Sequence, residues 1–274
     1  MNEELQNQIN RAAQLIDQTD CLVIAAGAGM GVDSGLPDFR GSDGFWKAYP
    51  ALREAGLEFS RIASPNSFRT FPQRAWGFYG HRLALYRNTA PHRGYAILKR
   101  WSEQMGIPCS VFTSNVDGQF QKAGFDPANI VECHGSIHHL QCLDKCATQI
   151  WDVNGFYPIV DEARCELVNE VPRCLYCDSI ARPNILMFSD WEWIDERTGQ
   201  QSRRQPSLFD RIQRPIVIEL GAGTAIPSVR HFSHRMIQYH GARLIRINPL
   251  ECEVPNTMDV GIKTGALDAL EAID

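Results

Sequence analysis

The sequence predicts an α/β protein with a doubly wound parallel sheet and a smaller zinc-binding module, and three observations support this fold class. Short apolar runs that are typical of buried strands occur at residues 21–29, 108–118, 128–136, 214–228 and 241–249. Apolar residues at helical spacing lie between them, over residues 75–86, 92–104 and 229–239, and precede them over residues 5–18. A cysteine-rich segment, residues 137–182, interrupts the alternation. Alternating strands and helices form parallel sheets, whose ligands bind beyond the carboxyl ends of the strands.

The glycine-rich stretch GAGMGVDSGLPDFRG, residues 27–41, begins within the last three residues of the first apolar run. Glycine at this density lets the backbone approach a ligand closely or adopt a positive φ. A strand, a glycine turn and the start of a helix, which we expect here, form the phosphate site of many α/β nucleotide-binding proteins. A tight turn between strand and helix would need glycine in any case, so this stretch by itself leaves both interpretations open.

Composition and charge exclude several classes of protein. The chain has 274 residues, of which 44% are hydrophobic, so a core can form and global disorder is excluded. The formal net charge is −5 and no long Lys/Arg run is present, which disfavours nucleic acid as a partner. The N-terminal segment is polar and no apolar stretch reaches membrane-spanning length, so we expect a cytoplasmic protein with no membrane partner.

The cysteines have the spacing of a metal site. Two pairs, Cys142/Cys146 and Cys174/Cys177, lie in the cysteine-rich segment. Such pairs bring four thiolates to a tetrahedral Zn²⁺, and four protein ligands leave no open position, so the predicted zinc is structural. Cys165 is interpreted as a bystander, with replacement of one ligand as the alternative. The other cysteines are interpreted as small apolar residues: Cys21, Cys109, Cys133 and Cys252.

Several segments, in order along the chain, resemble the signature motifs of the sirtuins, the NAD-dependent protein deacylases. The glycine-rich stretch resembles their NAD-binding motif, TSNVDGQFQKAG their Thr-Gln-Asn-Ile-Asp segment, and VECHGS their histidine–glycine catalytic segment. The cysteine pairs follow as in the family. ARPNILMFSD then resembles the substrate segment, ELGAGTAIP the Gly-Thr-Ser loop, and INP and TGALDALEAI the adenine end of the site. The resemblance spans residues 7–272, nearly the whole chain.

This resemblance implies a Rossmann-like domain and a zinc module, with the active site in the cleft between them. The NAD-binding domain is expected to comprise residues 1–40, 90–136 and 183–274, and the zinc-binding module residues 137–182. Residues 41–89 are expected to form a helical segment that carries the cofactor loop and the acyl pocket. The implied co-substrate is NAD, the implied metal is structural Zn²⁺, and the implied partner is an acyl-lysine protein or peptide.

The resemblance also assigns the residues that bind NAD. The backbone at Ala28 and its glycine neighbours would approach the pyrophosphate, Arg40 would contact a phosphate, and Phe39 would shield the reactive sugar carbon. Either Gly221 or Gly223 begins the equivalent of the Gly-Thr-Ser loop. The full set expected to bind the cofactor is Gly27, Ala28, Gly29, Asp38, Phe39, Arg40, Ser114, Asn115, Val116, Asp117, Gly221, Gly223, Thr224, Asn248, Gly265 and Ala266.

His134, Asn115 and Asp117 are the catalytic residues that the resemblance implies. Asn115 and Asp117 match the positions that hold the nicotinamide ribose and carboxamide, although on their own they would be interpreted as turn residues. His134 would take a proton from a ribose hydroxyl, because imidazole titrates near neutral pH. Three further histidines are interpreted as structural: His81, His138 and His139.

Residues that contact the acyl group are expected on the helix over residues 75–86. Tyr79 and Arg82 share one helix face and resemble the Tyr-x-x-Arg pair of sirtuins that remove succinyl or malonyl groups, since a hydroxyl and a guanidinium suit a terminal carboxylate. A solvent-facing aromatic–cation pair is the alternative. Phe188, from the substrate segment, is the third residue expected to bind the substrate.

Departures from the family pattern keep other activities open. Ser114 stands where the family usually has Gln, Gly31 where it has Ser, and residues 188–190 read Phe-Ser-Asp instead of Phe-Gly-Glu. A protein ADP-ribosyltransferase or an NAD hydrolase on the same fold is therefore the alternative to a deacylase. A non-catalytic NAD-binding module is a third hypothesis, which the presence of the implied catalytic residues disfavours.

Overall fold

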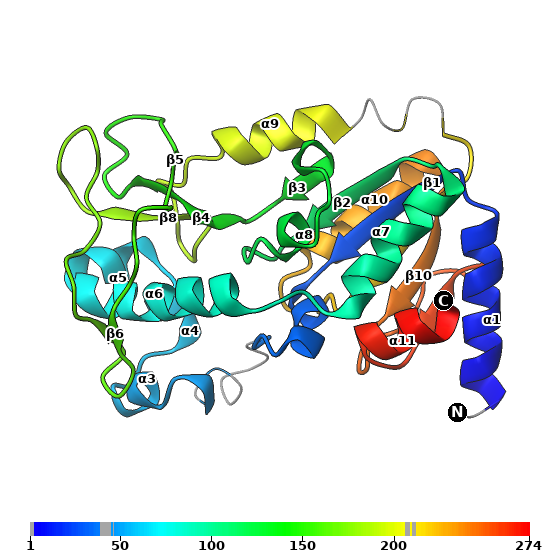
Figure 1. The fold of residues 1–274 in the computed structure, drawn as a ribbon, viewed down its shortest axis with the longest axis horizontal. Coiled ribbons are helices and arrows are strands. Elements are labelled where there is room, and N and C mark those ends of the chain that lie inside the picture. Colours follow the sequence, from blue (N-terminus) through cyan, green and yellow to red (C-terminus); the bar gives the residue numbers. More distant parts are fainter. Residues whose placement is uncertain (1–2, 39–44, 46, 206–208, 210–211) are drawn as a thin grey trace.

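The computed structural model describes residues 3–38, 45, 47–205, 209 and 212–274. A parallel sheet with helices on both faces forms one half of the molecule, and a smaller antiparallel sheet beside a group of helices forms the other half (Figure 1). This arrangement confirms the predicted fold class. The residue boundaries predicted for the domains stay predictions.

The large sheet has the strand order β11-β10-β9-β1-β2-β3, and each neighbouring pair is parallel. β1 and β9 are buried along their whole length, as expected of parallel strands covered on both faces, and they therefore occur in the sequence as continuous apolar runs. β11 has three residues, too few for a recognisable pattern. The strands are β1 (Cys21–Ala26), β2 (Cys109–Thr113), β3 (Ile130–Glu132), β9 (Pro215–Leu220), β10 (Arg243–Ile247) and β11 (Val260–Ile262).

Successive residues of β1 point to opposite faces of this sheet and contact different helices. Leu22 and Ile24 belong to a core shared with α1 (Glu3–Asp17), α7 (Arg93–Met105) and α11 (Ala266–Ile273). Cys21 and Val23 belong to the core on the other face, shared with α10 (Ser228–His240). Helices therefore cover both faces, and fully buried Cys21 fits its interpretation as a small apolar residue.

The helix that we expected after β1 is a 3₁₀-helix, η1 (Ala28–Ser34). Gly35 ends it in the left-handed conformation, with φ of 83°, and its N–H bonds to the carbonyls of Gly31 and Val32. Glycine costs about 1 kcal/mol per residue in an α-helix relative to alanine. Gly29 and Gly31 therefore disfavour an α-helix immediately after the strand.

The smaller half is built on β4 (Gly135–Cys142), which pairs antiparallel with β8 (Ala181–Ile185) and β5 (Trp151–Asp152). An aromatic core that includes Phe45, Phe68 and Trp76 lies between these strands and the helices. The remaining elements are α3 (Pro50–Glu54), α4 (Phe59–Ile62), α5 (Pro65–Thr70), α6 (Pro72–Asn88), α8 (Gln119–Lys122), η2 (Pro127–Asn129), β6 (Val160–Asp161), β7 (Glu166–Leu167) and α9 (Glu196–Arg204). No helix among the described residues is both long and apolar enough to cross a membrane.

We expect Gly77→Ala to destabilise the protein, although alanine normally favours a helix over glycine by about 1 kcal/mol. Gly77 lies in α6, and a Cβ there would sit 2.2 Å from the carbonyl oxygen of Cys165. Relieving this overlap should cost about 1–3 kcal/mol of unfolding free energy, measured by urea denaturation. The matched control is Gly155→Ala, whose Cβ meets nothing within 4 Å. A Gly77→Ala protein as stable as this control would contradict the close packing of α6.

Candidate functional site

Two glycine loops meet where the strand order reverses, between β1 and β9. The Gly29 N–H donates to the carbonyl of Gly221 over 3.1 Å. A Cβ on Gly221, whose φ is 60°, would lie 2.4 Å from Gly29, and a Cβ on Gly27 would lie 2.8 Å from Ala222. Neither position can carry a side chain, so both loops present bare backbone at the crevice where doubly wound sheets bind their ligands.

Asn115 joins the end of β2 to the end of β1. Its Nδ2 donates to the carbonyl of Gly27 over 3.0 Å, and its own N–H donates to Thr113 Oγ1. Ser114 is held to β1 by a backbone hydrogen bond to Ala26. Asn115 and the following Val116 are each 8% exposed, so this segment is part of the packed structure and not a free turn.

Asp117 follows in the same segment and is almost completely buried. Burial raises the pKa of its carboxyl group to about 6, while the Gln119 N–H, which donates to Oδ1 over 2.9 Å, and the charge of Arg82 lower it. Arg82 lies in α6, so a charged side chain of that helix lowers the pKa of a carboxyl group in the segment after β2. A buried carboxyl group with a perturbed pKa beside a strand end is typical of functional sites.

His134 lies just after β3, on the same edge of the sheet as Asn115. Its Nε2 is 3.0 Å from Ser228 Oγ, at the start of α10. Burial lowers its pKa below the usual histidine value, and a hydrogen bond to the backbone of Ser114 opposes this effect. The ring is therefore neutral at neutral pH and can accept a proton. Ser228 is a contact of this site that sequence patterns miss, because it is 94 residues away in the chain.

The loops after β9 and β10 are tied to each other. Asn248 Nδ2 donates to the carbonyl of Ala222 over 3.0 Å, and its Oδ1 accepts from two backbone N–H groups. Gly223 and Thr224 are exposed, and the Thr224 hydroxyl donates to Glu251. The expected adenine end of the site lies at the start of α11, where Ala266 is buried beside Gly265 and the Leu267 N–H donates to Asp33 of η1.

The cofactor loop that follows η1 is described only up to Asp38, which is partly buried. Phe39 and Arg40, which the sequence assigned to this loop, lie outside the described residues. Ala28 is exposed at the first position of η1, next to the glycine crevice. The predicted NAD-binding residues near Gly27, Asn115 and Asn248 thus lie along one edge of the parallel sheet.

Tyr79 and Arg82 are 1% and 9% exposed, so the alternative of a solvent-facing pair is wrong. The Arg82 guanidinium donates from Nε and Nη2 to the hydroxyl of Tyr86, over 2.9 and 2.6 Å. Its Cζ lies 5.3 Å from the ring centroids of Phe78 and Tyr86 and 5.8 Å from that of Tyr79. Burial raises the pKa of Tyr79 to about 12, so this hydroxyl remains a hydrogen-bond donor at neutral pH.

Phe188 is 38% exposed, and its N–H donates to the carbonyl of Ala63. The next residue, Ser189, adopts a left-handed φ of 53°, a conformation in which glycine is more stable. Asp190 accepts a hydrogen bond over 2.8 Å from Arg182, and both side chains are completely buried. This ion pair gives the Phe-Ser-Asp segment a structural role beside its expected role in substrate binding.

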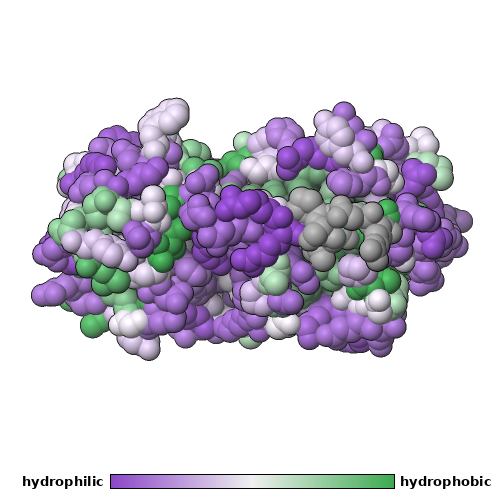
Figure 2. Space-filling view, turned by 90° about the horizontal axis from the view of Figure 1, so that it is seen from above, coloured by the Kyte–Doolittle hydropathy of each residue, from purple (hydrophilic) through white to green (hydrophobic). Residues whose placement is uncertain are grey.

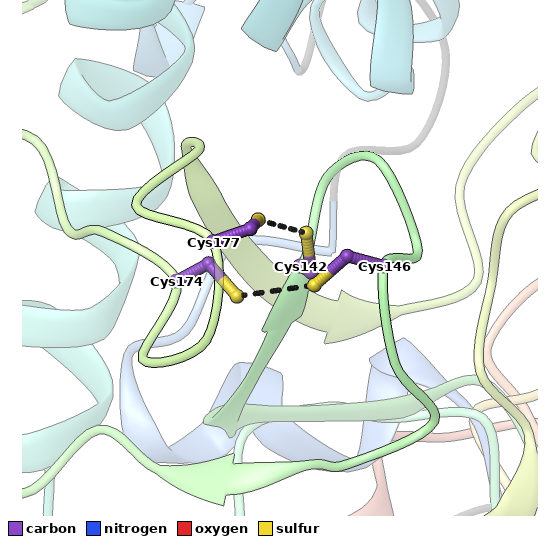
Figure 3. A group of neighbouring side chains, drawn as sticks. All are labelled: Cys142, Cys146, Cys174 and Cys177. Atoms are coloured by element: carbon purple, nitrogen blue, oxygen red, sulfur yellow. Dashed lines mark hydrogen bonds between the residues drawn. The ribbon is translucent and has the colours of Figure 1, made fainter.

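Four cysteines meet in the smaller half (Figure 3). The Cys142–Cys177 and Cys146–Cys174 sulfur pairs are 3.7 and 3.6 Å apart, and all four Sγ atoms lie within 4.8 Å of one another. Tetrahedral Zn²⁺ with Zn–S bonds of about 2.3 Å requires S–S separations of about 3.8 Å. The donor set therefore fits structural zinc. Cys165 lies outside the cluster, and burial raises the pKa of its thiol to about 12, so replacement of a ligand by Cys165 finds no support.

The histidines interpreted as structural each have a partner. Tyr49 Oη is 2.9 Å from His81 Nδ1, His138 Nε2 donates to the carbonyl of Asp117 over 2.9 Å, and His139 Nε2 is 3.3 Å from Asp152. His138 thus contacts the backbone of the segment that carries Asn115 and Asp117.

We expect Cys146→Ser to lower the bound zinc below one equivalent per chain and to reduce thermal stability, because structural zinc contributes directly to folding. Zinc content is measured by elemental analysis of the purified protein. Cys109→Ser is the control, since Cys109 lies in β2 outside the sulfur cluster. Equal zinc content in both variants would contradict the predicted ligand set.

Comparison with known proteins identifies relatives of this chain. Residues 27–202 match the model of the Sir2 family. An NAD-dependent protein deacetylase of Caldivirga maquilingensis is 29% identical over 266 residues, which cover 96% of this chain and 91% of the relative. An NAD-dependent protein deacylase 2 of Pyrobaculum aerophilum is 30% identical over 260 residues, covering 94% and 91%.

Solved structures share the fold. One, described as the structural basis for the mechanism and regulation of Sir2 enzymes, has a TM-score of 0.68 and 26% identity, and the match covers 98% of this chain and 96% of that one. A Sir2 homologue in complex with NAD has a TM-score of 0.70 at 23% identity, covering 96% and 92%. The family match over more than half of the chain shows that this chain belongs to the Sir2 family.

Proposed function

We propose that this protein is an NAD-dependent protein-lysine deacylase. The overall reaction consumes NAD, an acyl-lysine side chain and water, and yields nicotinamide, free lysine and O-acyl-ADP-ribose. The observation that carries the proposal is that Asn115, Asp117 and His134 follow the neighbouring strands β2 and β3, at the sheet edge where Asn115 bonds to Gly27. The relatives are named NAD-dependent protein deacylases and deacetylases.

The bare backbone at the crevice is proposed to hold the NAD pyrophosphate, since N–H groups can approach phosphate oxygens there without interference from side chains. Asn115 and Asp117 would hold the nicotinamide ribose and the carboxamide. Asn248, which braces the loops after β9 and β10, would define the adenine end together with the start of α11. These assignments place NAD across the point where the strand order reverses.

His134 is proposed as the general base. As the acyl oxygen attacks the anomeric carbon and nicotinamide leaves, a ribose hydroxyl must lose its proton before it attacks the resulting imidate. The neutral imidazole that burial produces can accept this proton, and its contacts with Ser114 and Ser228 would orient the ring. Water then completes the release of lysine. The site contributes mainly positioning and exclusion of bulk water.

Zn²⁺ would be held by Cys142, Cys146, Cys174 and Cys177 and would stabilise the fold. Four thiolates fill a tetrahedral coordination sphere, so this metal takes no part in the chemistry. Thiolate ligands persist in a reducing compartment, and all nine cysteines are free of disulfides, so we also propose a cytoplasmic location. The proposed partner is a protein or peptide that carries an acyl-lysine.

The acyl group is proposed to be acidic, succinyl or malonyl. Arg82 supplies a buried cation between aromatic rings, and Tyr79 supplies a neutral hydroxyl on the same helix face. Two guanidinium N–H groups of Arg82 donate to the Tyr86 hydroxyl, and these two hydrogen bonds fix the orientation of the planar guanidinium group. A fixed guanidinium and a hydroxyl together suit a terminal carboxylate.

The alternative is an ADP-ribosyltransferase or an NAD hydrolase on the same fold. Ser114 and the Phe-Ser-Asp segment motivate it, because they alter the positions near the ribose and the substrate. Both alternatives would release nicotinamide without an acyl-lysine peptide, so one assay separates them from the deacylase.

We expect nicotinamide release from NAD to require an acyl-lysine peptide, to produce O-acyl-ADP-ribose, and to be lost in His134→Ala. Release is measured by chromatography with acetyl-lysine peptide, with succinyl-lysine peptide and with no peptide. The control is His231→Ala, an exposed histidine of α10. Equal release without peptide would replace the deacylase by the alternative, and full activity of His134→Ala would remove the proposed base.

We expect Arg82→Met to lower kcat/KM for a succinyl-lysine peptide about 10- to 100-fold, as expected for the loss of one charge-assisted hydrogen-bonded contact. The value for an acetyl-lysine peptide should change much less, since that group carries no charge. The control is Arg53→Met, at an exposed position of α3, and thermal melting shows whether each variant is folded. Equal losses for both peptides would refute carboxylate recognition by Arg82.

A further inference from the structure

A cavity of about 350 Å³ lies where α6, α8, β4 and α9 meet. Tyr86 and Arg87 come from the end of α6, and the segment from Asp117 to Lys122 contributes part of the wall. Ser136, His138 and His139 of β4 and Arg197 of α9 complete the lining. Seen from above, the surface around α9 is strongly hydrophilic (Figure 2). The volume is within the range of small-molecule sites.

The lining contains three cationic side chains and one carboxylate, Asp117. The Arg87 guanidinium donates to the carbonyls of Val153 and Phe156, and the Lys122 ammonium donates to those of Arg87 and Thr89. Carbonyl oxygens satisfy these donors without neutralising their charge. The positive charges of Arg87 and Lys122 therefore remain available to an anion in the cavity.

Arg197 is the third cation. Its Nη2 pairs with Glu132 over 2.5 Å, whereas its Nη1 is buried and has no hydrogen-bond partner among the described residues. An unsatisfied buried donor costs free energy, so a ligand that accepts from it is favoured.

Acidic groups nearby offset part of this positive charge, and the excess comes from Arg87 and Lys122, which have no carboxylate partner among the described residues. Asp117 is buried with a raised pKa, Glu132 is used by Arg197, and Asp152 is mostly exposed beside His139. Burial lowers the pKa of His139 to about 4, and the charge of Arg197 adds to this effect. The pKa of His138 is also lowered, first by burial and with a contribution from the charges of Arg87 and Arg197.

We propose that this cavity is a binding site for a small metabolite that carries a phosphate or carboxylate group. The anionic group would lie between Arg87, Lys122 and Arg197, where charge-assisted hydrogen bonds are strongest. This inference does not rest on the proposed deacylase activity, because Arg87, Lys122 and Arg197, which carry it, have no role in the proposed reaction.

Binding in this cavity would be coupled to the nicotinamide end of the NAD site. His138 lines the cavity and donates to the carbonyl of Asp117. The next residue, Gly118, has a φ of 71°, and a Cβ there would lie 2.8 Å from the His138 ring. An anion that moves His138 or raises the pKa of its ring therefore acts directly on the Asp117 segment. By linkage, NAD and the anion must alter each other's affinity by the same factor.

Calorimetry of the full chain tests the site without NAD or peptide. Inorganic phosphate and citrate are titrated separately at constant ionic strength, with chloride as the balancing anion. We expect saturable binding of at least one probe and about tenfold weaker binding in Lys122→Gln, the loss of one charge-assisted contact. The control is Arg235→Gln, which removes one positive charge from an exposed position of α10.

The two probes separate the sources of the anionic group: tighter phosphate binding indicates a phosphorylated metabolite, and tighter citrate binding indicates a carboxylate. No saturable binding of either probe, or equal weakening in both variants, would overturn the proposal. Histidine NMR titration gives a second readout, since a bound anion should raise the pKa of His139 above about 4. If the unmodified protein binds an anion but has no deacylase activity, the result contradicts the proposed function and leaves the anion site in place.

Discussion

The close approach of the loops after β1 and β9 is the constraint on which the candidate site depends. Gly27 and Gly221 leave no room for a Cβ, so the two backbones can touch where the strand order reverses. Amide side chains from the neighbouring strands then brace each loop: Asn115 holds the carbonyl of Gly27, and Asn248 holds that of Ala222. The edge of the sheet is thus fixed before any ligand binds, which lowers the entropic cost of binding.

Burial determines the protonation states along this edge. It lowers the pKa of His134 and raises that of Asp117, so desolvation favours the neutral form of both groups. Arg82 opposes the effect at Asp117, because its charge lies in the same buried region. A single helix, α6, therefore contributes both the proposed acyl pocket and part of the electrostatic environment of the nicotinamide end.

β4 connects the metal cluster to the candidate catalytic histidine. Cys142 is the last residue of this strand, and His134 directly precedes its first residue, Gly135. Gly135 has a φ of 80°, and a Cβ there would lie 2.1 Å from the carbonyl oxygen of Asn184 in β8. The tight β4–β8 contact is held at its far end by the sulfur cluster, since Cys174 and Cys177 lie shortly before β8. Loss of zinc would loosen this strand pair and with it the position of His134.

The sequence by itself determined the fold class, the strands that end at the site and the four cysteines. These features have local causes: apolar runs, helical spacing, glycine turns and paired ligands leave periodic or clustered patterns. It also identified Asn115, Asp117 and His134 as candidates, through motifs that resemble those of a known family. The sequence did not predict that the helix after β1 is of the 3₁₀ type, because helix type depends on local glycine content and on packing against the β9 loop.

Tertiary structure alone decided which residues meet across long separations in the chain. Ser228 lies beside His134, Asp190 pairs with Arg182 in the interior, and Arg82 is buried among aromatic rings instead of facing solvent. Three separate helices contribute a cationic side chain to one cavity: Arg87, Lys122 and Arg197. Such contacts depend on how whole elements pack, and burial then determines the charge states of the groups involved. No pattern of neighbouring residues in the chain carries that information.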